Sequence, residues 1–249
     1  MIRLITPLLI LLMGICSTAC GDSNHDKAVE HALAGEKLAA QGQYDEALGE
    51  CNKAIKLDPE LAKAYYYRGW IYDELGELEK AIIDFTKAIE IDREYAWAFA
   101  NRGVTYRKTG EINLAIADYD MSIKLDPYNA MSWYNRGVAY DDLGQYEKSI
   151  ADYSSTIEVD PGDFVAYISR AGTYYKLENY TQAIYDYTKA LELDPNNPTT
   201  YLRRGVTHAD NGELELAVSD IERCISLTLD SELKEKATTL LEELQETVY

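Results

Sequence analysis

The chain has 249 residues, of which 47% are hydrophobic and 27% are charged, a composition typical of a folded globular protein. Acidic residues number 43 against 24 lysines and arginines, which gives a formal net charge of −19. This charge, and the lack of any lysine or arginine cluster in the sequence, argues against nucleic acid and anionic lipid headgroups as partners.

A short apolar segment opens the chain. Leu4–Ile15 follows a single basic residue, Arg3, and is too short to span a bilayer comfortably. The small residues Ser17–Ala19 come next and are followed by Cys20. This order of features predicts an export signal in residues 1–19 rather than a transmembrane helix.

The junction between Ala19 and Cys20, followed by polar residues, resembles a bacterial lipoprotein signal. The resemblance implies that Cys20 becomes the first mature residue and carries a lipid, and that residues 20–27 form a polar tether. The protein would then be exported and anchored to the cell membrane or cell envelope through this lipid alone. Ser17 stands where such signals prefer leucine, and it also fits ordinary secretory cleavage. The alternative is a soluble protein, either secreted or periplasmic.

A period of 34 residues organises the rest of the chain. Counting from Ala28 gives six units: 28–61, 62–95, 96–129, 130–163, 164–197 and 198–231. One glycine series occupies position 8 of the units, with an alanine in the fifth: Gly69, Gly103, Gly137, Ala171 and Gly205. A second series occupies position 15: Gly42, Gly76, Gly110, Gly144 and Gly212. A period of this length predicts a solenoid of stacked repeats.

Each unit has the pattern of two helices. In the fourth unit the first pattern covers about Ala130 to Leu143, and the second covers about Tyr146 to Val159. Gly144 separates the two patterns, and Pro161 follows the second, where proline cannot continue a helix.

The two glycine series have different predicted roles. Glycine at position 8 lies where the second helix crosses the first, so a small residue lets the helix axes approach. Glycine at position 15 ends a helix and can take a positive φ. In the fifth unit Glu178 replaces this second glycine, so we expect a different turn there.

Arginine and aspartate also recur with the period. The arginines occupy position 7 of the units: Arg68, Arg102, Arg136, Arg170 and Arg204. The aspartates occupy position 23: Asp84, Asp118, Asp152, Asp186 and Asp220. One opposite charge per helix predicts ion pairs between packed helices, in preference to a catalytic or anion-binding ladder.

Motifs of enzymes and cofactor sites are absent from the sequence. His25, His31 and His208 are scattered, with no constellation of metal-ligand or nucleophile spacing. Cys51 and Cys224, in the first and last units, are predicted to be small core residues too far apart to form a disulfide. The sequence therefore predicts a protein that is not an enzyme and holds no cofactor or metal.

The units resemble tetratricopeptide repeats. In the fourth unit the residues that carry the resemblance are Trp133, Gly137, Tyr140, Gly144, Tyr146, Tyr153 and Pro161. The other copies extend it over residues 28–231. The resemblance implies an all-α fold, a right-handed superhelical solenoid of antiparallel helix pairs. Residues 232–249 carry an apolar face opposite glutamates and lysines, and resemble the C-terminal capping helix with which this family closes its arrays.

In this family the first helix of each unit lines a concave groove that binds a peptide or helix of a partner protein. Carried over, the resemblance implies a partner-binding groove lined by Lys63, Tyr66, Trp70, Asp73, Trp97, Asn101, Arg107, Met131, Tyr134, Asn135, Asp141, Ile168 and Tyr175. The implied function is a protein–protein interaction scaffold. The alternative is a self-assembling or dimeric structural component of the envelope that has no peptide ligand.

Overall fold

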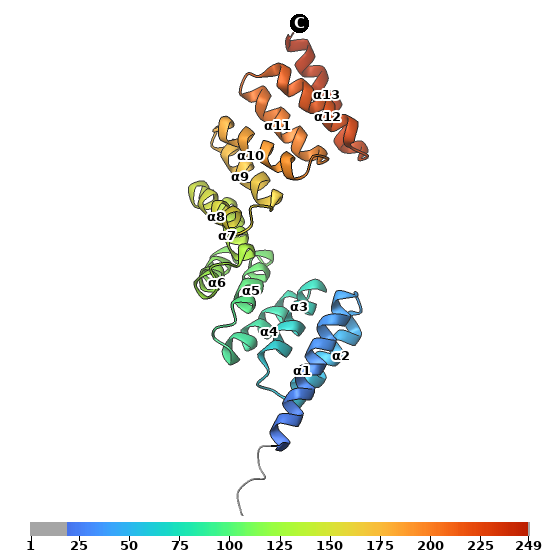
Figure 1. The fold of residues 1–249 in the computed structure, drawn as a ribbon, viewed down its shortest axis with the longest axis vertical. Coiled ribbons are helices and arrows are strands. Elements are labelled where there is room, and N and C mark those ends of the chain that lie inside the picture. The colour runs from blue at the N-terminus through green and yellow to red at the C-terminus, as the bar shows by residue number, and fades with distance from the viewer. Residues whose placement is uncertain (1–18, 249) are drawn as a thin grey trace, which may run out of the picture. The chain divides into compact units, whose positions relative to one another are not determined.

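The computed structural model describes residues 19–248, which form thirteen α-helices and no strand (Figure 1). This confirms the all-α prediction. The chain divides into two compact units, Met1–Arg93 and Glu94–Tyr249, hereafter the N-terminal unit and the C-terminal unit. The boundary coincides with the end of the second repeat, where the chain has Arg93 in place of the proline of most other repeats.

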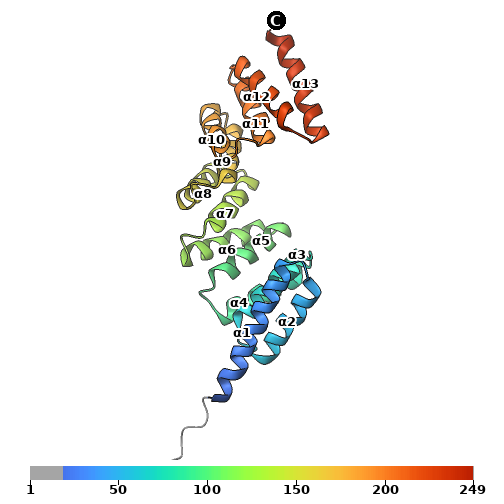
Figure 2. The same ribbon diagram turned by 45° about the vertical axis from the view of Figure 1, so that its right-hand side comes forward.

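Two helix pairs make up the described part of the N-terminal unit (Figure 2). Its helices are α1 (Ala19–Ala40), α2 (Tyr44–Leu57), α3 (Ala62–Glu74) and α4 (Leu78–Ile91). Helix α1 packs against α2 and α3 packs against α4, while α3 also contacts both helices of the preceding pair. The two pairs therefore stack as consecutive repeats.

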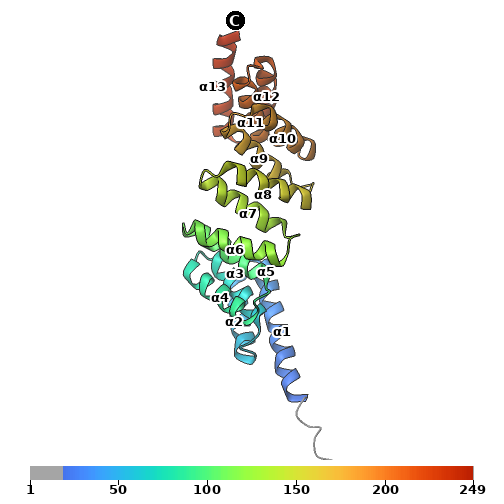
Figure 3. The same cartoon turned by 90° about the vertical axis from the view of Figure 1, so that its left-hand side faces the viewer.

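The C-terminal unit continues the pattern with four helix pairs and a single last helix (Figure 3). Its helices are α5 (Ala96–Lys108), α6 (Ile112–Leu125), α7 (Ala130–Asp142), α8 (Tyr146–Val159), α9 (Phe164–Lys176), α10 (Tyr180–Leu193), α11 (Pro198–Asp210), α12 (Leu214–Leu227) and α13 (Ser231–Val248). Direct contacts join α5 to α7 and α7 to α9. We call the surface formed by α5, α7, α9 and α11 the inner face.

Helix α13 closes the C-terminal unit by packing on α12 and α11. Its Ala237 is fully buried and lies in one apolar cluster with Ile221 and Cys224 of α12, and Leu240 and Leu244 pack against that cluster. This arrangement covers the apolar side of the last repeat, as a capping helix does.

The beginning of α1 includes the residues that the sequence predicts to be a polar tether. Residues 20–27 are helical, and Ala28, which follows them in the helix, is fully buried. The His25 ring lies 2.5 Å from Asp58, measured between Nδ1 and Oδ2. Residues 1–18 of the predicted signal peptide lie outside the described residues. Within residues 19–248, no helix has the length and apolarity needed to cross a membrane.

The glycines at position 8 allow the close packing that the sequence predicts. A Cβ atom on Gly103 would lie 2.7 Å from Cε1 of Tyr119, and one on Gly137 would lie 2.9 Å from the same atom of Tyr153. Gly35 has the same role in the first repeat, where an added Cβ would lie 2.7 Å from a cysteine sulfur. We did not pick out Gly35 from the sequence, although its spacing from Gly69 follows the period.

The turn at Glu178 corrects one expectation. Glu178 takes a φ of 59°, close to the 70° of Gly144 in the preceding repeat. Its amide donates to the carbonyl of Tyr175 at 2.9 Å, as the Gly144 amide donates to Asp141 at 2.9 Å. The prediction of a different turn is therefore wrong: this hydrogen bond and that of the next amide, Asn179 to the carbonyl of Tyr174, close the turn with a non-glycine residue in the left-handed conformation.

Candidate functional site

The periodic arginines and aspartates pair within each repeat, as predicted. Arg136 donates from Nε and Nη2 to the two carboxylate oxygens of Asp152, at 2.8 and 2.7 Å. The same two-pronged bond joins Arg68 to Asp84, Arg102 to Asp118, Arg170 to Asp186 and Arg204 to Asp220. All five aspartates are buried, so these pairs hold the two helices of a repeat in register.

Four of these arginines also bind the repeat before them. Through Nη1 they donate to residues of the preceding second helix: Arg68 to Asn52 (2.6 Å), Arg136 to Asp120 (2.5 Å), Arg170 to Ser154 (2.8 Å) and Arg204 to Thr188 (3.0 Å). Burial lowers the pKa of the Arg136 guanidinium, but its two carboxylate partners outweigh burial and raise the pKa above the ordinary value. These arginines connect three helices and have a structural role.

Charged groups on the inner face pair with one another between repeats. Arg107 of α5 lies 3.4 Å from Asp142 of α7, measured from Nη1 to Oδ2. In the next step Lys176 of α9 makes a short ion pair with Asp141, whose other carboxylate oxygen accepts from Thr173 at 3.0 Å. Two charged residues of the predicted groove, Arg107 and Asp141, are therefore engaged within the repeat array.

Partners 35 residues apart also join α9 to α11, where the donor is a neutral tyrosine hydroxyl. The Tyr175 hydroxyl donates to Asp210 at 2.5 Å. This hydrogen bond, and secondarily burial, raises the pKa of Tyr175 to about 12. Tyr175 thus stays protonated at physiological pH and joins α9 to α11.

The two asparagines of the predicted groove bind their own helices. The Asn101 side-chain amide donates to the carbonyl of Trp97, and that of Asn135 donates to the carbonyl of Met131, both at 2.9 Å. These contacts direct both amides along the helix backbone.

Several aromatic and apolar side chains of the predicted groove are partly buried. Tyr134 places its hydroxyl 3.1 Å from that of Ser169 and its ring 5.5 Å from the ring of Tyr153. Ile168 packs against a buried cluster that contains Tyr187. These residues connect adjacent helices of the C-terminal unit while keeping part of their surface on the inner face.

The predicted groove residues of the N-terminal unit divide between core and surface. Tyr66 lies with its ring 5.4 Å from that of Tyr67, and Trp70 packs against the buried cluster around Ile71. Lys63 is exposed and Asp73 is partly buried. Trp70 therefore serves mainly as a packing residue.

An exposed apolar row lies at position 2 of three successive repeats in the C-terminal unit. Trp97 is 47% exposed, Met131 is partly exposed, and Val165 is 41% exposed. Val165 was not among the residues that we predicted, although its place in the repeat is that of Trp97. The 34-residue period is the signal in the sequence that identifies this position.

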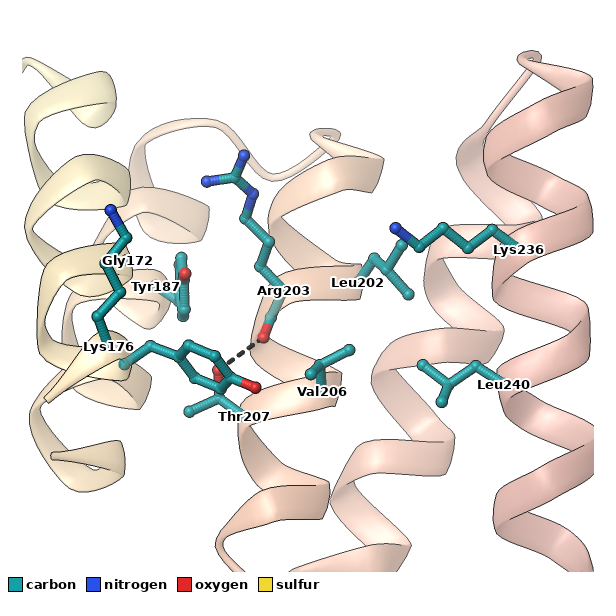
Figure 4. Close-up of a pocket in the computed structure, with 10 residues that line it drawn as sticks. Gly172, Lys176, Tyr187, Leu202, Arg203, Val206, Thr207, Lys236 and Leu240 are labelled. Carbon is teal, nitrogen blue, oxygen red and sulfur yellow. Dashed lines mark hydrogen bonds between the residues drawn. The ribbon is translucent and has the colours of Figure 1, made fainter. Parts of the chain in front are cut away.

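A pocket of about 390 Å³ opens between α9, α10, α11 and α13 (Figure 4). Its lining residues are Gly172, Tyr175, Lys176, Tyr187, Leu202, Arg203, Val206, Thr207, Lys236 and Leu240. Only Tyr175 belongs to the groove that the sequence predicts. The pocket could not be read from the period, because Lys236 and Leu240 reach it only through the packing of α13.

No metal site is found among the described residues, and the two cysteines whose side chains are described are buried. No cluster of three histidine, cysteine, aspartate or glutamate side chains there is arranged to hold a metal ion. Cys51 and Cys224 are free and buried, which confirms their predicted core role. Burial raises the pKa of Cys51 to about 12, so its thiol is inert at neutral pH.

Matches to known families decide what this repeat is. The tetratricopeptide repeat family matches residues 62–95, 96–129, 130–163 and 198–231, and a second TPR repeat description matches residues 35–76 and 171–212. The chain belongs to the tetratricopeptide repeat family. The resemblance inferred from the fourth unit is thus confirmed over most of the helical array.

Solved structures of other TPR proteins share the fold. YrrB, described as a TPR protein with an unusual peptide-binding site, is 22% identical with a TM-score of 0.65, over 76% of this chain and 97% of its own. MamA is 28% identical with a TM-score of 0.60, over 65% of this chain and 94% of its own. PilF of Pseudomonas aeruginosa is 16% identical with a TM-score of 0.76, over 87% of this chain and 99% of its own. No curated protein matches the sequence.

Proposed function

We propose that this TPR protein is an interaction scaffold that binds an extended or helical segment of a partner protein along the inner face of its C-terminal unit. The observation that carries the proposal is the exposed apolar row formed by Trp97, Met131 and Val165. Large apolar side chains that stay exposed at a regular spacing are anchor positions for a partner. The peptide-binding site in the description of YrrB, which has the same fold, supports this assignment.

The pairing of the inner-face charges supports apolar anchoring. Because Arg107 and Asp141 already have partners in neighbouring repeats, a ligand that used them would first have to break those contacts. Binding energy would then come mainly from the apolar row, with the paired charges at its edge. A groove of this kind would bind in the micromolar range, about −8 kcal/mol.

We also propose that this scaffold is anchored to the cell envelope through a lipid on Cys20. The sequence around Cys20 supports it, and residues 20–27 at the start of α1 precede Ala28, which is fully buried. These eight helical residues would separate the lipid from the packed repeats by about 12 Å. Replacement of Cys20 by serine should release the protein from envelope membranes into the soluble fraction. A serine variant that stays on the membrane would contradict lipid anchoring.

The binding proposal is tested by cross-linked capture from envelopes of the host. The wild type is compared with a Trp97→Ala/Met131→Ala variant, and with Tyr128→Ala as a matched control at an 83% exposed aromatic in the turn between α6 and α7. All three proteins should first show equal helicity and equal melting temperatures.

We expect one protein to be captured by the wild type and the control and lost from the double variant. Equal capture by all three proteins would refute the role of the apolar row. If only the protein itself is recovered, and light scattering shows a dimer or larger assembly, the self-assembling alternative replaces the scaffold.

A further inference from the structure

The pocket beside α13 combines an apolar base with a cationic rim. Leu202, Val206 and Leu240 supply apolar surface, while Lys176, Arg203 and Lys236 come from three different helices. Figure 4 shows the three cationic side chains extending along one side of the pocket, with Val206 and Leu240 away from their charged ends.

The charge of this pocket is opposite to that of the chain. None of its lining residues is acidic, although the chain has 43 acidic residues against 24 lysines and arginines. The Lys176 amine is engaged by Asp141, and Tyr175, which also lines the pocket, donates to Asp210. Arg203 and Lys236 form no ion pair with any residue in the described range 19–248, so two cations at the rim are available to an incoming anion.

Arg203 shares the pocket with Tyr187, which is buried. Burial raises the pKa of Tyr187, and the charge of Arg203 opposes that increase. Arg203 and Tyr187 both line the pocket, and Lys236 approaches it from the facing helix α13 (Figure 4).

We infer that this pocket binds a partner peptide segment in which a large apolar side chain is adjacent to an aspartate or glutamate. The apolar side chain would enter between Leu202, Val206 and Leu240, and the carboxylate would accept hydrogen bonds from Arg203 and Lys236. A volume of about 390 Å³ lies near the lower end of the range for ligand pockets and has room for one or two side chains.

A peptide fits this site better than a free small molecule because the pocket adjoins the inner face. Tyr175 and Lys176 line the pocket and also take part in the contacts that join α9 to α11 and α7. A segment bound along the inner face would therefore reach the pocket without leaving the array. The inference rests on the proposed scaffold function and adds to it the chemistry of one part of the partner.

The test uses a phage-displayed library of random peptides selected on three forms of the protein. These are the wild type, an Arg203→Glu/Lys236→Glu variant, and a Lys124→Glu/Lys234→Glu control. The control changes the net charge equally at two exposed lysines outside the pocket. Enriched peptides are then measured by fluorescence anisotropy beside counterparts in which asparagine or glutamine replaces the acidic residue.

We expect the wild type and the control to enrich peptides with an acidic residue next to leucine, isoleucine or phenylalanine. The amide counterparts should bind at least about tenfold more weakly, as should the acidic peptides to Arg203→Glu/Lys236→Glu. Peptides with no acidic preference, unaffected by Arg203→Glu/Lys236→Glu but lost from the Trp97→Ala/Met131→Ala variant, would overturn the pocket assignment and leave the scaffold function intact.

Two further outcomes would also overturn the inference. Enrichment of no peptide by any form would count against both the pocket assignment and peptide binding by the scaffold. Binding of oleate that depends on Arg203 and Lys236, without any peptide enriched, would assign the pocket to an anionic amphiphile instead.

Discussion

Removal of Asp186 should be among the most destabilising single changes in the C-terminal unit. Asp186 is 1% exposed and accepts two hydrogen bonds from Arg170, whose side chain is only 16% exposed. In Asp186→Ala the guanidinium would keep only the Ser154 hydroxyl, a neutral partner at 2.8 Å. Breaking a buried ion pair from one side costs about 3–5 kcal/mol, which we expect here.

The equivalent change two helices earlier should cost less. In Asp152→Ala, Arg136 would keep a carboxylate partner, because its Nη1 also donates to Asp120 at 2.5 Å. The Asp120 side chain is 52% exposed, so solvent screens this pair and its contribution is about 1 kcal/mol at most. We therefore expect Asp152→Ala to destabilise by about 1 kcal/mol less than Asp186→Ala.

Urea denaturation followed by circular dichroism gives the overall change in the free energy of unfolding. Repeat arrays can unfold in segments, so hydrogen exchange of the pairs α7–α8 and α9–α10 should accompany it. Asp120→Ala is the control and should cost less than about 1 kcal/mol by itself. In high salt the difference between the two aspartate variants should shrink. Equal losses for Asp152→Ala and Asp186→Ala at low salt would refute the compensating role of Asp120.

Three other changes test local packing and chemistry. Glu178→Gly should stabilise the protein by about 0.5–1 kcal/mol, because it removes a non-glycine residue from the left-handed conformation. Gly144→Glu should destabilise the protein by about 1–2 kcal/mol for the same reason. Equal melting temperatures for the wild type and both variants would show that no backbone strain is present. Gly137→Leu should cost about 1–3 kcal/mol because even a Cβ would lie 2.9 Å from the Tyr153 ring, and an unchanged urea midpoint would show that the helices separate freely. Burial raises the pKa of the Cys51 thiol to about 12, so iodoacetamide at pH 8 should label it at least about a hundredfold faster in urea than in the folded protein. Peptide mass spectrometry measures the two labelling rates. Equal rates would show that the thiol is exposed to solvent in the folded protein.

The helices and the contacts inside one repeat could be predicted from the sequence. The 34-residue period indicates which side of each helix is buried. The helix bounds predicted for the fourth repeat also agree with α7 and α8 to within one residue. The pairing of Arg136 with Asp152 was predictable for the same reason: the two residues recur at fixed positions on two helices joined by a short turn.

The contacts between repeats could be identified only from the tertiary structure. Four of the arginines have a second partner in the preceding repeat, which is an asparagine, aspartate, serine or threonine, so no repeated letter marks it. The engagement of Lys176 by Asp141 likewise depends on how closely α7 and α9 approach, which a pattern along one helix does not specify. The sequence could thus propose Asp141 for the groove but could not show that its charge is already paired.

The turn at Glu178 and the pocket beside α13 also could not be predicted from the sequence pattern. Local preference favours glycine at a positive φ, yet the hydrogen bonds and packing of the fifth repeat override that preference at Glu178. The pocket requires Arg203 and Lys236 to approach from helices whose relative placement is set by the apolar packing of α13 on α12. Periodicity determines which face of a helix is buried, whereas the angle and depth at which two helices pack decide which side chains of that face remain available to a partner.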